Sequence, residues 1–291
     1  MKLLNKALLV GVLTATIYNA NALIINENVF QSYGGDLNNI AASLKYANNE
    51  LRESSYNNPF FTVGKIYGCT ATWLGDDSQW TYILTAAHCY SYTSEITAVI
   101  SPRDFWSWNN QLLASGKGFF YVPPERINKP AGFGGASTDI GILKIPKVAM
   151  PTDKNGVIVQ RPILNDSSNE INNVVEFVGY GTWGVGLDQS GSYSPATGPR
   201  RLWAASKISE IFEKDHGIGA KYQPNGSTDY WARSASGDSG SAWWQDQNGK
   251  KVIIATNCGS SSTKSVGARV SKYIGWIQSI YPDVRVLSKG N

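Results

Sequence analysis

Three short segments of the sequence carry side chains that could perform acid–base chemistry together. His88 lies at the end of an apolar run, Asp139 opens another apolar run, and Ser239 lies in a glycine-rich turn. A serine hydroxyl attacks well only when a base removes its proton, and a third group must hold that base in the right tautomer. The sequence therefore predicts Ser239 as nucleophile, His88 as base and Asp139 as the group that orients His88.

The turn around Ser239 also offers hydrogen-bond donors. Attack on a carbonyl builds negative charge on its oxygen, and this charge needs donors that are already in place. Glycines allow a tight turn with close backbone approach, so the N–H groups of Gly237 and Ser239 are the predicted donors. The order His, Asp, Ser differs from that of subtilisins and of α/β-hydrolases, and the G-x-S-x-G elbow of the latter fails because residue 241 is serine.

The motifs that hold these residues resemble those of the trypsin/chymotrypsin-like serine peptidases. They are TAAHC, TDIGILKI and GDSG, supported by GCTATWL, VGYGT and ARVSKYIGWI, and together they span residues 59–281. The resemblance implies an all-β chymotrypsin fold of two Greek-key, six-stranded antiparallel barrels with a C-terminal helix. It also implies hydrolysis of protein or peptide substrates through an acyl-enzyme, as in a bacterial exported member, with no cofactor and no metal.

The hydrophobic pattern favours the same architecture. From Phe60 onward, short apolar runs alternate with turn residues, which is typical of an antiparallel barrel or sandwich. Two segments have helical spacing instead. Residues 37–54 place Ile40, Leu44, Ala47 and Leu51 on one stripe, and residues 270–280 form a closing helix.

The N-terminus has the three parts of a secretory signal. A basic start precedes an uncharged apolar core and the small residues Ala20-Asn21-Ala22. The apolar core is shorter than the ~20 residues that a membrane-spanning helix needs. We expect a signal peptide at 1–22, an N-terminal segment at 23–58 that is a pro-segment or a packed element, the peptidase domain at 59–281, and a tail at 282–291. The expected location is secreted or periplasmic, without stable membrane insertion.

Composition narrows the class of partner. The net charge of +4 and the 16% of charged residues give no basic surface for nucleic acid. Ten tryptophans and fifteen tyrosines argue against disorder, since they must be buried. We expect a monomer that acts on peptides.

The three cysteines divide into a pair and one other. The resemblance implies a disulfide between Cys69 and Cys89, which export permits. Cys258 is left over, and it follows Thr256 and Asn257 in the segment that binds substrate backbone in the family. The usual pocket disulfide is missing because residue 235 is alanine. Cys258 is therefore a thiol in or near the pocket, or a plain buried thiol.

The resemblance places Arg233 at the base of the specificity pocket. A cation there would repel lysine and arginine side chains and could attract an acidic one. Alternatively, an insertion shifts the register or Arg233 pairs with a structural acid. The sequence therefore predicts only that the enzyme does not cleave as trypsin does.

Activation departs from the family pattern. In the family, a new N-terminal amine pairs with the acid just before the nucleophile, here Asp238, but no Ile-Val-Gly-Gly start occurs. The amine could belong to Leu23 after signal cleavage, or to an end cut within 45–53. Another cation could satisfy Asp238 instead.

Two other functions would fit the same residues. One is a catalytically latent binding protein on the same fold, although such proteins typically lose a triad residue. The other is an esterase that uses the same triad.

Overall fold

The computed structural model describes residues 23–90, 97–127, 133–181, 183–186, 201–225 and 227–289. The predicted signal peptide lies outside these residues. Among the described residues, no helix has the length and apolar character needed to cross a bilayer.

Six antiparallel strands close the first barrel in the order β2-β3-β4-β7-β6-β5. Their bounds are β2 Val63–Ile66, β3 Cys69–Asp76, β4 Trp80–Thr85, β5 Thr97–Trp106, β6 Leu112–Tyr121 and β7 Gly141–Pro146. The apolar runs of β4 and β7 are almost wholly buried, because these strands lie side by side within the barrel wall. Phe105, Phe120 and Leu143 pack in its interior.

A second barrel follows, with strands in the order β14-β9-β11-β12-β16-β15, and pairing of β14 with β15 closes the ring. Its strands are β9 Val174–Gly179, β11 Leu202–Phe212, β12 Gly217–Lys221, β14 Ala242–Gln247, β15 Lys250–Ser260 and β16 Lys264–Arg269. Two short strands extend the sheet beside β15, namely β8 Ile163–Leu164 and β17 Arg285–Val286. The predicted pair of six-stranded antiparallel barrels is thus confirmed.

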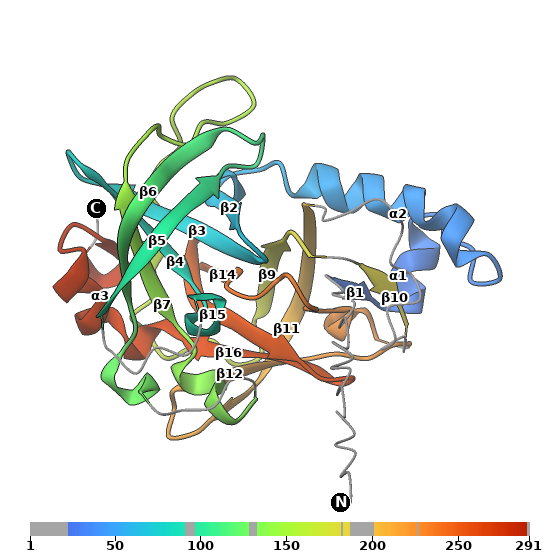
Figure 1. The fold of residues 1–291 in the computed structure, drawn as a ribbon. Coiled ribbons are helices and arrows are strands. Elements are labelled where there is room, and N and C mark those ends of the chain that lie inside the picture. The colour runs from blue at the N-terminus through green and yellow to red at the C-terminus, as the bar shows by residue number, and fades with distance from the viewer. Residues whose placement is uncertain are drawn as a thin grey trace, which may run out of the picture.

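The helices lie at the two ends of the molecule (Figure 1). The C-terminal helix α3 spans Ile274–Ile280 after a short 3-10 turn, Val270–Lys272. At the other end, α1 Glu27–Ser32 and α2 Ile40–Ser54 lie beside the second barrel, and α2 packs against β11. The predicted stripe on α2 faces the core, with Leu44, Ala47 and Leu51 buried and Ile40 half-buried.

The N-terminal segment belongs to the packed body of the second barrel. Leu23, Ile25 and Phe30 are fully buried in that barrel's core. Strand β1 (Ile24–Ile25) lies between β10 (Gly184–Val185) and β13 (Ala232–Arg233) in a small sheet of its own. These contacts place the segment's first residues next to the strand that leads to Ser239.

Candidate active site

Strand pairing in the first barrel brings His88 and Asp139 together. Thr85, the last residue of β4, is paired with Gly141, the first of β7. The residues just after β4 and just before β7 therefore meet at one edge of the barrel. His88 lies in the 3-10 turn Ala87–Tyr90, and its Nδ1 is 2.6 Å from Oδ2 of Asp139. The backbone N–H of His88 also donates to Oδ1 of Asp139 at 2.9 Å.

Asp139 is fully buried, and its carboxylate is nevertheless well compensated. Burial by itself would raise its pKa, but the hydrogen bond and charge of His88, the charge of Arg126 and a hydrogen bond from Cys258 outweigh burial. The pKa of Asp139 is therefore held below its ordinary value, so that the carboxylate is ionised when His88 must accept a proton. The guanidinium of Arg126 lies 3.4 Å from Oδ1.

The turn that carries Ser239 is fastened to the first barrel. Thr70 donates from its backbone N–H to the Ser239 carbonyl at 2.9 Å and from its hydroxyl to the Gly237 carbonyl at 2.9 Å. Gly237 has φ +94°, a conformation that favours glycine. Gly240 lies against the side-chain hydroxyl of Thr85 and the backbone nitrogen of Ala86, two residues before His88. The second barrel thus presents Ser239 beside the edge that holds His88 and Asp139.

Replacement of Gly240 by alanine is expected to lower both thermal stability and peptidase activity. An added Cβ would clash with Oγ1 of Thr85 and with the Thr70 carbonyl, so the Ser239 turn must move. Overpacking of this kind costs about 1–3 kcal/mol. The matched control is Gly249→Ala, since Gly249 has a similar φ (+77° against +82°) and nothing within 4 Å of an added Cβ. Equal losses in the melting temperature and kcat of the two variants would contradict the close approach at Gly240.

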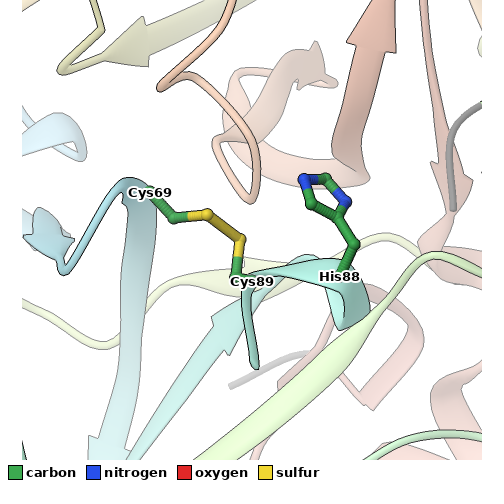
Figure 2. Close-up of side chains that lie close together, drawn as sticks. All are labelled: Cys69, His88 and Cys89. Carbon is green, nitrogen blue, oxygen red and sulfur yellow. A yellow bond between two sulfur atoms is a disulfide. The ribbon is translucent and has the colours of Figure 1, made fainter. Parts of the chain in front are cut away.

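The disulfide expected beside His88 is present. Cys69 at the start of β3 is bonded to Cys89. Figure 2 shows the imidazole of His88 standing beside this bridge, on the same short turn as Cys89. The bridge therefore ties the turn that carries His88 to the neighbouring strand.

The acid before Ser239 is enclosed by backbone. Asp238 is fully buried and accepts hydrogen bonds from the N–H groups of Gly181, at 3.3 Å, and Ala235, at 3.1 Å. Burial outweighs these two bonds and raises the pKa of Asp238 to about 7. The N–H of Gly184, three residues after Gly181, donates to the Leu23 carbonyl at 2.9 Å. The start of β1 and the Asp238 carboxyl thus contact one short stretch of chain.

The comparison with protein families agrees with this geometry. The Trypsin family model matches residues 51–277. The chain belongs to the trypsin family. A solved structure described as a Glu endopeptidase in complex with MPD shares the fold, with a TM-score of 0.50 and 18% sequence identity, and the match covers 79% of this chain and 94% of that chain. No curated protein matches the chain.

Strand β15 runs close to the nucleophile turn, but the residues on it that were predicted to bind substrate are closed to solvent. Thr256 and Asn257 are fully buried. The Asn257 carbonyl accepts from Gly240 N–H at 2.9 Å, and its side-chain amide donates to the Asp238 carbonyl at 3.2 Å. Asn257 thus braces the turn, whereas Thr256 pairs within the sheet with Ala242 and Ala268. Cys258 is likewise buried, and its thiol donates to Asp139.

Arg233 lies on β13 next to this trypsin-family turn. It is 7% exposed, and β1 pairs with it through Ile24. Its guanidinium donates to the Ser234 carbonyl at 3.4 Å and to Oγ of Ser260 at 3.3 Å, and it lies 5.5 Å from the Tyr222 ring centre. Arg233 is therefore held by polar and aromatic contacts beside the turn that leads to Ser239.

Among the described residues, two groups of side chains lie close enough together to act as metal ligands. One includes Cys69 and Cys89, whose sulfurs are committed to the disulfide. The other is His88, Asp139 and Cys258, where Nδ1 of His88 is already bonded to the carboxylate. Burial, together with the charge of Asp139, raises the pKa of the Cys258 thiol. The thiolate that a metal would bind is thereby disfavoured, and the cluster fits an acid–base relay better than a metal site.

Two further residues lie near this site. His216 is half-buried in the turn between β11 and β12, with its ring 5.7 Å from that of Tyr273. Arg126 was not anticipated at all, because it lies 13 residues before Asp139 in a stretch without a recognisable motif.

Proposed function

We propose that this protein is an exported serine endopeptidase in which Ser239, His88 and Asp139 form the catalytic triad. The contact of 2.6 Å between His88 and the buried carboxylate of Asp139 carries the proposal. Such a contact fixes the imidazole tautomer so that Nε2 is left to accept the serine proton. Cleavage of unstructured peptides by the purified protein, with the Ser239→Ala variant as blank, tests it.

The reaction follows from these positions. Oγ of Ser239 attacks the scissile carbonyl while His88 takes its proton, and His88 then returns that proton to the departing amine. Water, deprotonated by His88, hydrolyses the acyl-enzyme and releases Ser239. Asp139 stays ionised and stabilises the imidazolium in both halves of the reaction.

The backbone of the nucleophile turn can stabilise the oxyanion. Within the part of the chain that the structure describes, the N–H groups of Gly237 and Ser239 donate to no protein acceptor. Polar backbone groups near a buried site are normally satisfied. The two donors are therefore available for the substrate oxygen, where each is worth about 10²–10³ in kcat.

The charge of Arg233 supports a preference for an acidic side chain at P1. At the position six residues before the nucleophile, a guanidinium would repel lysine and arginine side chains, and a substrate carboxylate could pair with it. The structural neighbour is itself described as a Glu endopeptidase. For this chain, the proposed preference for an acidic P1 side chain is based on the position of Arg233 and not on that neighbour.

Signal cleavage after Ala22 would also supply the activating amine. Leu23 is fully buried just before β1. Its carbonyl accepts from the N–H of Gly184, and the Asp238 carboxyl accepts from the N–H of Gly181, three residues earlier in the chain. A buried carboxylate with no cation is costly, and an amine nearby offsets that cost. We therefore assign the amine to Leu23, and residues 23–58 to the mature enzyme.

N-terminal sequencing of the exported protein is expected to give Leu23 as the first residue. A variant with Ala-Ser added before Leu23 should lose most of its kcat. In that variant the raised pKa of Asp238 means that the folded state binds a proton more readily than the unfolded state. Its unfolding free energy should therefore fall as the pH rises from about 4 through about 7, and the mature protein should not show this fall. A mature N-terminus within 45–53, or full activity in the extended variant, would overturn the assignment.

A further inference from the structure

The carboxylate of Asp139 has a partner that the triad itself does not require. His88 occupies Oδ2 and also donates its backbone N–H to Oδ1, which is enough to fix the imidazole. Arg126 additionally pairs with Oδ1 at 3.4 Å. The side chains of Asp139 and Arg126 are 0% and 9% exposed, so the positive charge acts in a region of low dielectric.

The fold holds the guanidinium of Arg126 in place. Arg126 ends the 3-10 turn Pro124–Arg126, which follows strand β6, and its N–H donates to the Pro123 carbonyl at 2.9 Å. Consecutive prolines fix the backbone dihedral φ at this turn. The other arm of the guanidinium donates to the Gly135 carbonyl at 3.2 Å, on the segment that leads into Asp139. The cation is therefore built into the site.

A fixed cation changes the proton affinity of the His88–Asp139 pair. When both ring nitrogens of His88 carry protons, it is unable to act as a base. When Nε2 has lost its proton, His88 can act as a base and keeps the Nδ1 proton that faces Asp139. A positive charge within a few ångströms disfavours the protonated pair, whichever of the two residues is assigned the proton. The same charge also offsets the cost of burying the carboxylate.

We propose that Arg126 is a positioning residue whose positive charge acts on the carboxylate of Asp139. It thereby keeps His88 available as a base at lower pH than the triad alone would allow. This inference rests on the proposed role of His88 in catalysis. It makes Arg126 a determinant of the enzyme's working pH range, not of its substrate choice.

Other polar groups surround the pair and must be held constant. Cys258 donates its thiol to Asp139 from β15. Ser137 lies next to the pair in sequence, and it contacts the carboxylate of Glu213 through its hydroxyl and the hydroxyl of Tyr273 through its carbonyl. Glu125 precedes Arg126 on the same turn. All of these groups stay the same in the variants below, so differences between variants report the Arg126 charge.

The test follows the titration of His88 directly. The sequence has only two histidines, so ring signals in NMR spectra of the mature protein are few, and a His216→Gln variant assigns them. The Ser239→Ala background permits this measurement without self-cleavage. The variants are Arg126→Gln, which removes the charge, and Arg126→Lys, which keeps it. Lys154→Gln is the control for net charge, since Lys154 is an exposed residue paired with Glu53. The pH dependence of kcat/KM is then measured with Ser239 restored.

For Arg126→Gln, we expect the imidazole titration midpoint and the acid limb of kcat/KM to rise together by about one pH unit. In Arg126→Lys and Lys154→Gln both should stay near the wild-type values. An unchanged or lower midpoint in Arg126→Gln would overturn the proposal. A rise of a full pH unit in the midpoint of Arg126→Lys would also overturn it. The lysine variant therefore tests the proposal even if the glutamine variant does not fold. A wild type that cleaves no peptide would instead refute the proposed function, and the NMR midpoints would still decide the role of Arg126.

Discussion

The Ser239→Ala and His88→Ala variants are each expected to lower kcat on a peptide substrate by about 10⁶-fold, and the double variant by no more than either single one. Nucleophile and base act as one unit, so once either is lost, the loss of the other removes little further catalysis. The measurement is kcat on a fluorogenic peptide, with an intact Cys69–Cys89 bridge verified in each variant.

The non-additivity is the informative part of this experiment. Gly249→Ala serves as the control. An added Cβ at Gly249 has nothing within 4 Å, so this variant should leave kcat unchanged. Retention of a thousandth or more of the wild-type kcat in either single variant would contradict the assigned roles. A double variant far below both single ones would show that Ser239 and His88 act separately.

Among substrates that differ only at P1, kcat/KM is expected to depend on the charge of the P1 side chain. The wild type should cleave the glutamate substrate with a kcat/KM about 100-fold above that for the glutamine substrate, and it should cleave the lysine substrate least. The expected reason is a desolvated pair between the substrate carboxylate and Arg233, since loss of one partner of such a pair costs about 2–5 kcal/mol.

The Arg233→Gln variant isolates that contribution. Its kcat/KM should fall for the glutamate substrate and stay nearly unchanged for the glutamine substrate, which has the same shape without the charge. Arg233 also contacts Tyr222 and Ser260, so equal losses on both substrates would indicate only a structural role. A wild-type preference for lysine or arginine at P1 would refute the pocket assignment.

Residues that lie within recognisable motifs, such as His88 and Asp139, could be predicted from the sequence. The strand register explains why. TAAHC ends an apolar strand and TDIGILKI begins one, so their pairing through Thr85 and Gly141 puts His88 and Asp139 side by side. The α2 stripe was visible because its apolar spacing persists over four turns. The succession of short apolar runs indicated an antiparallel barrel or sandwich, and the resemblance to the family implied two six-stranded barrels.

Features that depend on contacts between distant segments could not be predicted. Helix α1, which Asn26 caps, has only six residues. A helix this short contains too few turns for its apolar spacing to be recognised in the sequence. The insertion of Ile24 and Ile25 between β10 and β13 joins segments more than 150 residues apart. Arg126 reaches Asp139 only because a proline-rich turn and the segment before β7 fold back on each other. Packing between separated segments decides the last two of these cases.

The central claim is that Ser239 is a nucleophile activated by His88 and Asp139, and covalent labelling tests it most directly. The mature protein is treated with a fluorophosphonate probe, and the modified peptide is located by mass spectrometry. The account predicts one label per chain, on Ser239, with labelling abolished in Ser239→Ala and strongly slowed in His88→Ala. Wild-type labelling no faster than that of Ser239→Ala, or a label on another residue, would contradict it.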